Sequence, residues 1–309
     1  MVVLHMGMAR NAQGALEYLL LIAGGILAAM IVLIFLLIVS IPQAGQVFTD
    51  ILFSSQQQLN NTAGVSSLQF SPLTSLTGPT VLLGSSPNQL SFSYATNQLQ
   101  LQSYLSNIGT FQVSSPRIWK VELADASGGS FSIDSETINV PVLTAQAVQG
   151  STTFTQFVWD SIPLNGVDTM RVTVTISNAS NSPDFFWRIK TDIPVGYEIS
   201  KIHFPLFEIY PIGSNPNHVV LPIFGGTLFT VPFYNYSNTI RHPGATLQFM
   251  SLYDSMTNSG VYWASQDGEG YTKDYAIQSS SSHIEWDHIF YMPNPIPSSF
   301  EVPYSIILS

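Results

Sequence analysis

Residues 170–176 (Met170-Arg171-Val172-Thr173-Val174-Thr175-Ile176) decide the fold class of most of this chain. Apolar and polar residues alternate for seven positions, and Val, Ile and Thr favour extended structure, so the stretch predicts a half-buried β-strand. Moving outward, the same period of two recurs in short runs separated by Asn, Gly, Ser and Pro clusters, which are typical of turns. These runs lie at residues 90–94, 99–101, 118–123, 185–189 and 199–204. Helical periodicity is nearly absent from residue 89 onward, so we expect a large all-β sandwich over residues 88–309.

A different kind of segment lies at the amino-terminal end. From Tyr18 to Ile41 there are 24 residues without a charge. As a helix this run is roughly 36 Å long, which is enough to cross a hydrocarbon core of about 30 Å. Pro42 ends it. Arg10 is followed by no Lys or Arg until Arg117, so the positive-inside bias places the leader in the cytoplasm and the β region outside.

An acid, Glu17, stands at the head of this run, and an ionisable group in such a segment is a functional candidate. Residues 13–20 resemble the junction of archaeal type IV pilin-like proteins, which carry a class III signal peptide. The resemblance implies that Arg10 is the basic residue before the cut, that the cut lies at or near the Ala12–Gln13 bond, and that Gln13 becomes the new amino terminus. Glu17 is then the acid at the fifth mature position.

This resemblance implies a division of the chain and a function. Residues 1–12 are a cleaved signal peptide, 13–42 a long hydrophobic assembly and transmembrane α-helix, 43–87 a stalk and linker, and 88–309 an extracellular β-sandwich. The chain is then a pilin-like subunit, embedded in the membrane before it joins an adhesive cell-surface filament. The implied partners are copies of itself, a prepilin peptidase, the type IV pilus assembly ATPase and its membrane platform protein.

Charge pairing gives this assembly a physical basis. Cleavage frees an ammonium group at Gln13, and in a dry filament core that group would pair with the Glu17 carboxylate of a neighbour, because an unpaired buried charge is costly. The alternative is that Glu17 only reaches the headgroup region of a monomeric anchor. We therefore keep a second hypothesis, a membrane-anchored extracellular carbohydrate-binding protein with a pilin-type leader.

Composition excludes several classes of function. Charged residues make up only 9% of the chain, with 9 basic and 19 acidic residues, and loss of Arg10 leaves 8 and 19, a net charge of −11. This balance argues against nucleic acid as a partner, since phosphate binding depends on Lys and Arg. The chain has no Cys, which excludes disulfides, thiolate metal sites and cysteine nucleophiles. No Gly-x-Ser-x-Gly nucleophile motif is present. We expect neither an enzyme nor a cofactor.

A second resemblance concerns the β region. Five segments occur in the order found in the β-supersandwich domain that precedes the catalytic barrel of some large glycoside hydrolases: 117–123, 201–205, 221–226, 243–250 and 260–274. The resemblance covers about residues 88–305 as one domain. With no barrel before Ser309, it implies a fold and contact with surface glycans rather than hydrolysis.

Two groups of residues have the chemistry of cation ligands. A glycine-rich loop carries three acids that are candidate Ca²⁺ ligands, Asp267, Glu269 and Asp274, although a solvated turn explains their spacing as well. On a strand, His283, Glu285 and Asp287 would share one face. A polar outer face over buried Ile284 and Trp286 explains that pattern equally, so we predict no metal there.

Three Asn-x-Ser/Thr triplets are candidate glycosylation sites, since such triplets are N-glycan acceptors in exported proteins. Their acceptor residues are Asn60, Asn178 and Asn235.

Overall fold

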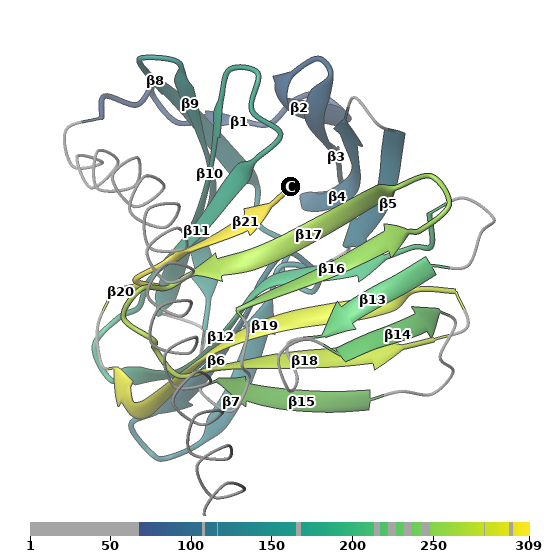
Figure 1. Cartoon of the computed structure of the whole chain (residues 1–309). Coiled ribbons are helices and arrows are strands. Elements are labelled where there is room, and N and C mark those ends of the chain that lie inside the picture. Colours follow the sequence, from purple (N-terminus) through teal and green to yellow (C-terminus); the bar gives the residue numbers. More distant parts are fainter. Residues whose placement is uncertain are drawn as a thin grey trace, which may run out of the picture. The chain divides into compact units, whose positions relative to one another are not determined.

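A computed structural model describes residues 68–106, 109–115, 117–164, 168–212, 217–221, 227–231, 237–242, 248–280, 282–296 and 299–309. These residues belong to a compact unit that spans Val65–Ser309. Within the described ranges all regular structure is β-strand, and every strand pairing is antiparallel (Figure 1). The all-β prediction is therefore confirmed for this part of the chain.

The first sheet combines strands from the middle of the chain with the carboxyl-terminal strand. Along the sheet its strands are β1 (Thr74–Ser75), β8 (Val142–Gln149), β9 (Thr152–Pro163), β10 (Thr169–Ala179), β11 (Phe185–Asp192), β21 (Ser305–Leu308), β17 (Ser259–Gln266), β16 (Phe249–Asp254), β13 (Asn217–Leu221) and β14 (Thr227–Val231), with β20 (Phe300–Glu301) beside β11.

The second sheet has long central strands. Its order is β15 (Ser237–His242), β18 (Lys273–Ser279), β19 (Ile284–Ile296), β12 (Tyr197–Ile209), β5 (Gly109–Ser115), β4 (Gln98–Ser106), β3 (Asn88–Ala95) and β2 (Thr80–Ser85), with β6 (Lys120–Asp125) between β12 and β7 (Ser130–Asp134).

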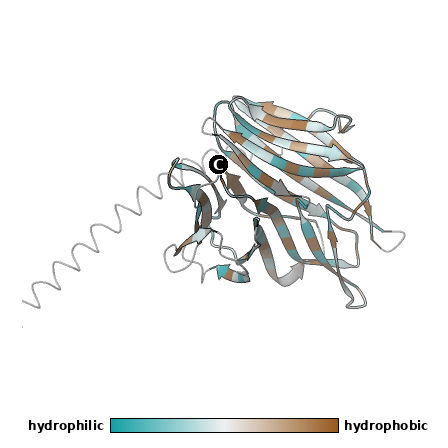
Figure 2. Ribbon diagram, turned by 90° about the vertical axis from the view of Figure 1, so that its right-hand side faces the viewer, coloured by the Kyte–Doolittle hydropathy of each residue, from teal (hydrophilic) through white to brown (hydrophobic). Residues whose placement is uncertain are grey.

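The two sheets pack face to face around an aromatic core. Apolar and polar residues alternate along the strands (Figure 2), and in β10 the alternation places Val172, Val174 and Ile176 in the core while Arg171 is exposed. All five Trp residues of the chain are buried. Trp263 of the first sheet and Trp286 of the second meet edge to face, with ring centroids 5.4 Å apart. Aromatic contacts of this kind hold the inner faces of the two sheets together. The alternation along each strand places the polar side chains on the outer faces.

Two sequence predictions concern the region before residue 88. Sheet structure begins at Thr74 rather than at residue 88, because β1 pairs with β8 and β2 pairs with β3. The expected hydrophobic helix over 13–42 lies outside the described residues. No helix in the described ranges is long and apolar enough to cross a membrane.

Candidate functional site

A polar row crosses four neighbouring strands of the second sheet. Glu208 of β12 lies directly opposite Glu285 of β19, Glu285 lies opposite Gln278 of β18, and Gln278 lies opposite Ser237 of β15. The next residues along three of these strands, Phe207, Trp286 and Ile277, are buried in the core. Because strand neighbours point to opposite faces, the polar row lies on the outer face of the sheet.

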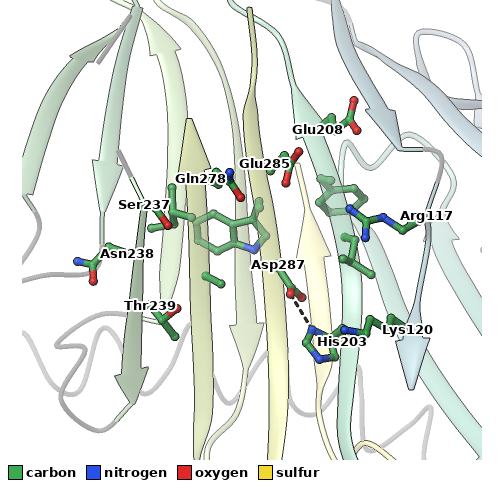
Figure 3. A pocket seen from close by; sticks show the side chains of 15 residues that line it. Arg117, Lys120, His203, Glu208, Ser237, Asn238, Thr239, Gln278, Glu285 and Asp287 are labelled. Atoms are coloured by element: carbon green, nitrogen blue, oxygen red, sulfur yellow. Dashed lines mark hydrogen bonds and ion pairs between the residues drawn. The ribbon is translucent and has the colours of Figure 1, made fainter. Parts of the chain in front are cut away.

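This row forms part of the floor of a surface hollow of about 170 Å³ (Figure 3). The floor has a second row, which consists of Asp287, Ala276 and Thr239. Beside this row the hollow is lined by Arg117, Lys120 and His203. The volume is below the roughly 300–1,000 Å³ typical of drug-sized ligand pockets. The hollow therefore suits one small polar group, with carboxylate, amide, hydroxyl and cationic side chains around it.

His203 connects the hollow to a charged network. Its Nδ1 lies 2.6 Å from Oδ2 of Asp287, and its Nε2 lies 3.1 Å from Oε1 of Glu122. Both contacts are hydrogen bonds only if both ring nitrogens carry a proton, so this geometry fits an imidazolium held between two carboxylates. Figure 3 marks the bond to Asp287 with a dashed line.

Glu122 is the centre of this network. One carboxylate oxygen lies 2.9 Å from Nζ of Lys201, and the other lies 3.1 Å from His203 and 3.3 Å from Nζ of Lys120. Burial alone would raise the pKa of Glu122. The hydrogen bond from Lys201 and the positive charges of His203 and Lys201 outweigh burial, and with Lys120 they lower that pKa to about 2. Glu122 is therefore ionised throughout the neutral and mildly acidic range.

Two of the floor carboxylates, those of Glu208 and Glu285, lie close to a histidine beside the hollow, His283. Among the described residues, Glu208, His283 and Glu285 are the group of three whose metal-binding atoms all lie within 4.8 Å of one another. The side chains of Glu208 and Glu285 lie next to each other in Figure 3. The sequence pattern placed His283 and Glu285 on one face, but it grouped them with Asp287, whose carboxylate instead holds His203.

The three acids of the predicted Ca²⁺ loop do not converge. Asp267 is buried, pairs with Nζ of Lys273 and accepts N–H bonds from Glu269 (3.1 Å) and Gly270 (2.9 Å). Asp274 forms a two-pronged pair with Arg241 at 2.8 and 2.9 Å, and the side chain of Glu269 is exposed. The carboxylates of Asp267 and Asp274 are thus committed to separate cations.

Lys273 in that cluster is fully buried, and Nζ lies 4.3 Å from the ring centroid of Tyr304. Desolvation lowers the pKa of Lys273 to about 8, although the contact with Asp267 acts in the opposite direction. This arrangement closes the loop onto the core, so it serves the fold rather than ligand capture.

The glycosylation candidates have different surroundings. The Asn178 side chain is buried, and its Nδ2 donates to the carbonyl oxygens of Ser182 (3.0 Å) and Asp184 (2.9 Å). A glycan on Nδ2 would break this turn, which argues against Asn178 as an acceptor in the folded unit. Asn60 and Asn235 lie outside the described residues. So do the cleavage residues Arg10, Ala12 and Gln13 and the assembly residue Glu17.

Comparison with known proteins supports the fold. No family model and no curated protein matches the chain. Among solved structures, the chain is similar to the alpha-N-acetylgalactosaminidase NagBb from Bifidobacterium bifidum (quadruple mutant), with 10% identity, a TM-score of 0.51, and coverage of 74% of this chain and 36% of that one. It is also similar to the galactosidase domain of the alpha-galactosidase-sucrose kinase AgaSK, with 9% identity, a TM-score of 0.54, and coverage of 78% and 41%.

These neighbours are glycoside hydrolase β-sandwich domains, so the resemblance inferred from the order of the sequence segments is confirmed at the level of the fold. This chain spans 36% of the length of the NagBb chain and 41% of the galactosidase-domain chain of AgaSK. At these identities the likeness concerns architecture and carries no residue of either enzyme's active site across.

Proposed function

We propose that this chain is the structural subunit of an archaeal type IV pilus-like cell-surface filament, and that the filament is adhesive. The observation that carries the proposal is the order of features in residues 10–41: a basic residue, a small residue, Gln13, Glu17 and then an apolar run long enough to span a bilayer. A β unit that begins soon after this run fits a subunit whose helix is buried in a filament core and whose β-sandwich is displayed outside.

In this proposal the helix polymerises and the β unit provides the surface. The ammonium group of Gln13 pairs with Glu17 of a neighbouring copy and selects one axial register, because other registers would leave both charges unpaired in an apolar core. The prepilin peptidase, the assembly ATPase and the platform protein act on the helix end. The β unit has no catalytic role, and its repetition along a filament converts weak single-site contacts into firm adhesion.

The decisive experiment determines the first residue of the protein sheared from native cells by mass spectrometry. A start at Gln13 in material that pellets as filaments is the expected result. An intact Met1, or a start beyond Ile41, would remove either the free ammonium group or the helix and would overturn the proposal.

A second candidate function is carbohydrate binding by a membrane-anchored protein that forms no abundant fibre. The hollow favours it, because its carboxylate, amide and hydroxyl groups match the hydroxyls of a sugar. The named structural neighbours act on galactose-type sugars. Galactose and N-acetylgalactosamine glycans are thus the first probes, tested by calorimetry on the full chain in detergent.

Two observations separate the candidates. If the variant Gln278→Ala loses glycan binding and the variant Glu269→Gln keeps it, the glycan binds in the hollow. Gln278 lines the hollow, whereas Glu269 is exposed outside it. Abundant filaments on cells would favour the structural role, whereas a monomeric anchored protein that binds glycans would favour the second candidate.

A further inference from the structure

Two carboxylates on the hollow floor stand in an arrangement that is unfavourable by itself. Glu208 and Glu285 occupy directly opposite positions on the antiparallel strands β12 and β19. Like charges in such a cross-strand pair destabilise a sheet. A cation at this point would relieve that repulsion.

In the part of the chain that the structure describes, the ion pairs of the Lys and Arg side chains go to other carboxylates. Each of these eight residues pairs with a carboxylate other than Glu208 or Glu285. The partners are Glu122, Glu136, Asp160, Asp192, Asp267, Asp274 and Glu301. His283, whose Nε2 lies next to Glu285, or a bound ion can supply positive charge at the Glu208–Glu285 pair.

His283 is held in the orientation of a metal ligand. Its Nδ1 lies 3.1 Å from the hydroxyl of Ser280 and 3.0 Å from that of Ser282, and its Nε2 lies 3.6 Å from Oε1 of Glu285. In the tautomer with the proton on Nδ1, the ring donates to a serine hydroxyl and Nε2 presents a lone pair toward the carboxylates. Ligating histidines are commonly fixed by a hydrogen bond at the other ring nitrogen.

Tyr210 orients the remaining ligand. Its hydroxyl donates to Oε2 of Glu208 at 3.2 Å, and its ring lies 5.5 Å from the His283 ring at an angle of 38°. One tyrosine thus positions both a carboxylate and the imidazole. Outer contacts of this kind are what a preorganised metal site requires.

We propose that Glu208, His283 and Glu285 bind a divalent transition-metal ion of the zinc class. Zinc takes imidazole nitrogen and carboxylate oxygen at about 2.0–2.2 Å in tetrahedral geometry, so two ligand atoms on one ion are about 3.4 Å apart. Nε2 of His283 and Oε1 of Glu285 are already 3.6 Å apart, and the 4.8 Å limit of the cluster means that carboxylate movements of roughly 1.5 Å or less complete the set.

The ligand chemistry selects the ion. Two carboxylates match the charge of M²⁺, and the imidazole nitrogen favours zinc over Ca²⁺ or Mg²⁺, which prefer oxygen. Three protein ligands leave a fourth position for water. Metal binding at this site does not require filament assembly.

Calorimetric titration of Zn²⁺ into the tag-free, chelator-treated full chain in detergent tests the proposal. We expect one Zn²⁺ per chain and binding at least tenfold weaker in Glu208→Gln, His283→Gln and Glu285→Gln. Glu269→Gln is the matched variant, because Glu269 is an exposed acid outside both the hollow and the ligand set, and it should keep wild-type affinity. Absence of stoichiometric binding, or equal loss in Glu269→Gln, would overturn the assignment.

Thermal unfolding separates a ligand role from a structural one. In metal-free buffer Glu285→Gln should melt no lower than the wild type, because it removes a like-charge pair. Added Zn²⁺ should raise the melting temperature of the wild type but not of this variant, since an ion that binds only the folded state stabilises it. Equal Zn²⁺ shifts in both proteins would refute the site.

Discussion

Replacing Glu122 by Gln should remove the centre of the charged network beside the hollow. The folded-state pKa of Glu122 is about 2, against an ordinary value of 4.5. At about 1.36 kcal/mol per pKa unit, this lowering corresponds to roughly 3 kcal/mol. The side chain is 23% exposed, so screening reduces this, and we expect a loss of about 2–3 kcal/mol at pH 7.

The pH dependence has a defined sign. A carboxyl whose pKa is lowered by folding stabilises the folded state above its unfolded pKa, and this contribution is lost as pH falls through the folded pKa. The free energies of unfolding of wild type and Glu122→Gln should thus differ fully above pH 4.5 and converge as pH falls toward 2.

Urea unfolding of the full chain in detergent, followed by tryptophan fluorescence, measures this difference. All five Trp residues are buried in the β unit, so their signal reports on that unit. Glu198→Gln is the matched control, because Glu198 is exposed on the neighbouring strand β12 and none of the ion pairs among the described residues includes it. A difference between wild type and Glu122→Gln below about 0.5 kcal/mol at pH 7, within the scatter of ordinary surface substitutions, or one that persists unchanged at pH 2, would refute the reasoning.

Three further predictions test other parts of the molecule. Glu17→Gln should abolish filaments on cells, because it removes the proposed ion pair with the amino terminus of a neighbouring copy. Mass spectrometry should still find the leader cleaved, since the cleavage site is unchanged. Normal filaments in this variant would contradict the ion pair. Gly84→Ala should lower the free energy of unfolding by roughly 1–3 kcal/mol, since the glycine has φ of 88° and an added Cβ would collide with a backbone carbonyl oxygen, whereas Gly150→Ala, with φ of 59° and open space, should cost less. Lys273→Met should cost about 3–5 kcal/mol because it leaves the Asp267 carboxylate buried without its cation, and adding Asp267→Asn should recover part of that loss in urea titrations.

The strands were readable from sequence wherever one face is buried and the other is wet. The alternation at 170–176 identified β10, and the runs at 90–94 and 99–101 identified β3 and β4. β2 was missed because its apolar residues are consecutive rather than alternating: Val81, Leu82 and Leu83 lie between Thr80 and Gly84. A run of that kind in a Ser- and Gly-rich segment has no periodicity to separate it from a linker.

The hollow could not be read from sequence, because it depends on register. His203 and Asp287 are separated by 84 positions, and the bulge between His203 and Leu206 changes which β19 residues lie opposite β12. A shift of one residue would turn every side chain to the other face, so no local pattern specifies which charges meet. The sequence does indicate that charged residues share a strand face. Lys120 and Glu122 are two positions apart, as are Lys201 and His203, and residues two apart on a strand point to the same side.

The pairing of charges also constrains how copies of the β unit can meet. Each of the eight Lys and Arg residues of this unit already has a carboxylate partner in its own chain. A contact between two copies that relied on a new ion pair would first have to break an internal one, and exposed pairs are worth only about 0–1 kcal/mol, so the exchange gains little. The acids outside these ion pairs, among them Glu208 and Glu285, contribute repulsion between copies. New ion pairs between β units therefore add little cohesion to the proposed filament, which fits a polymer held by its apolar helices. A divalent ion at the Glu208–Glu285 pair would reduce the repulsion between the displayed surfaces.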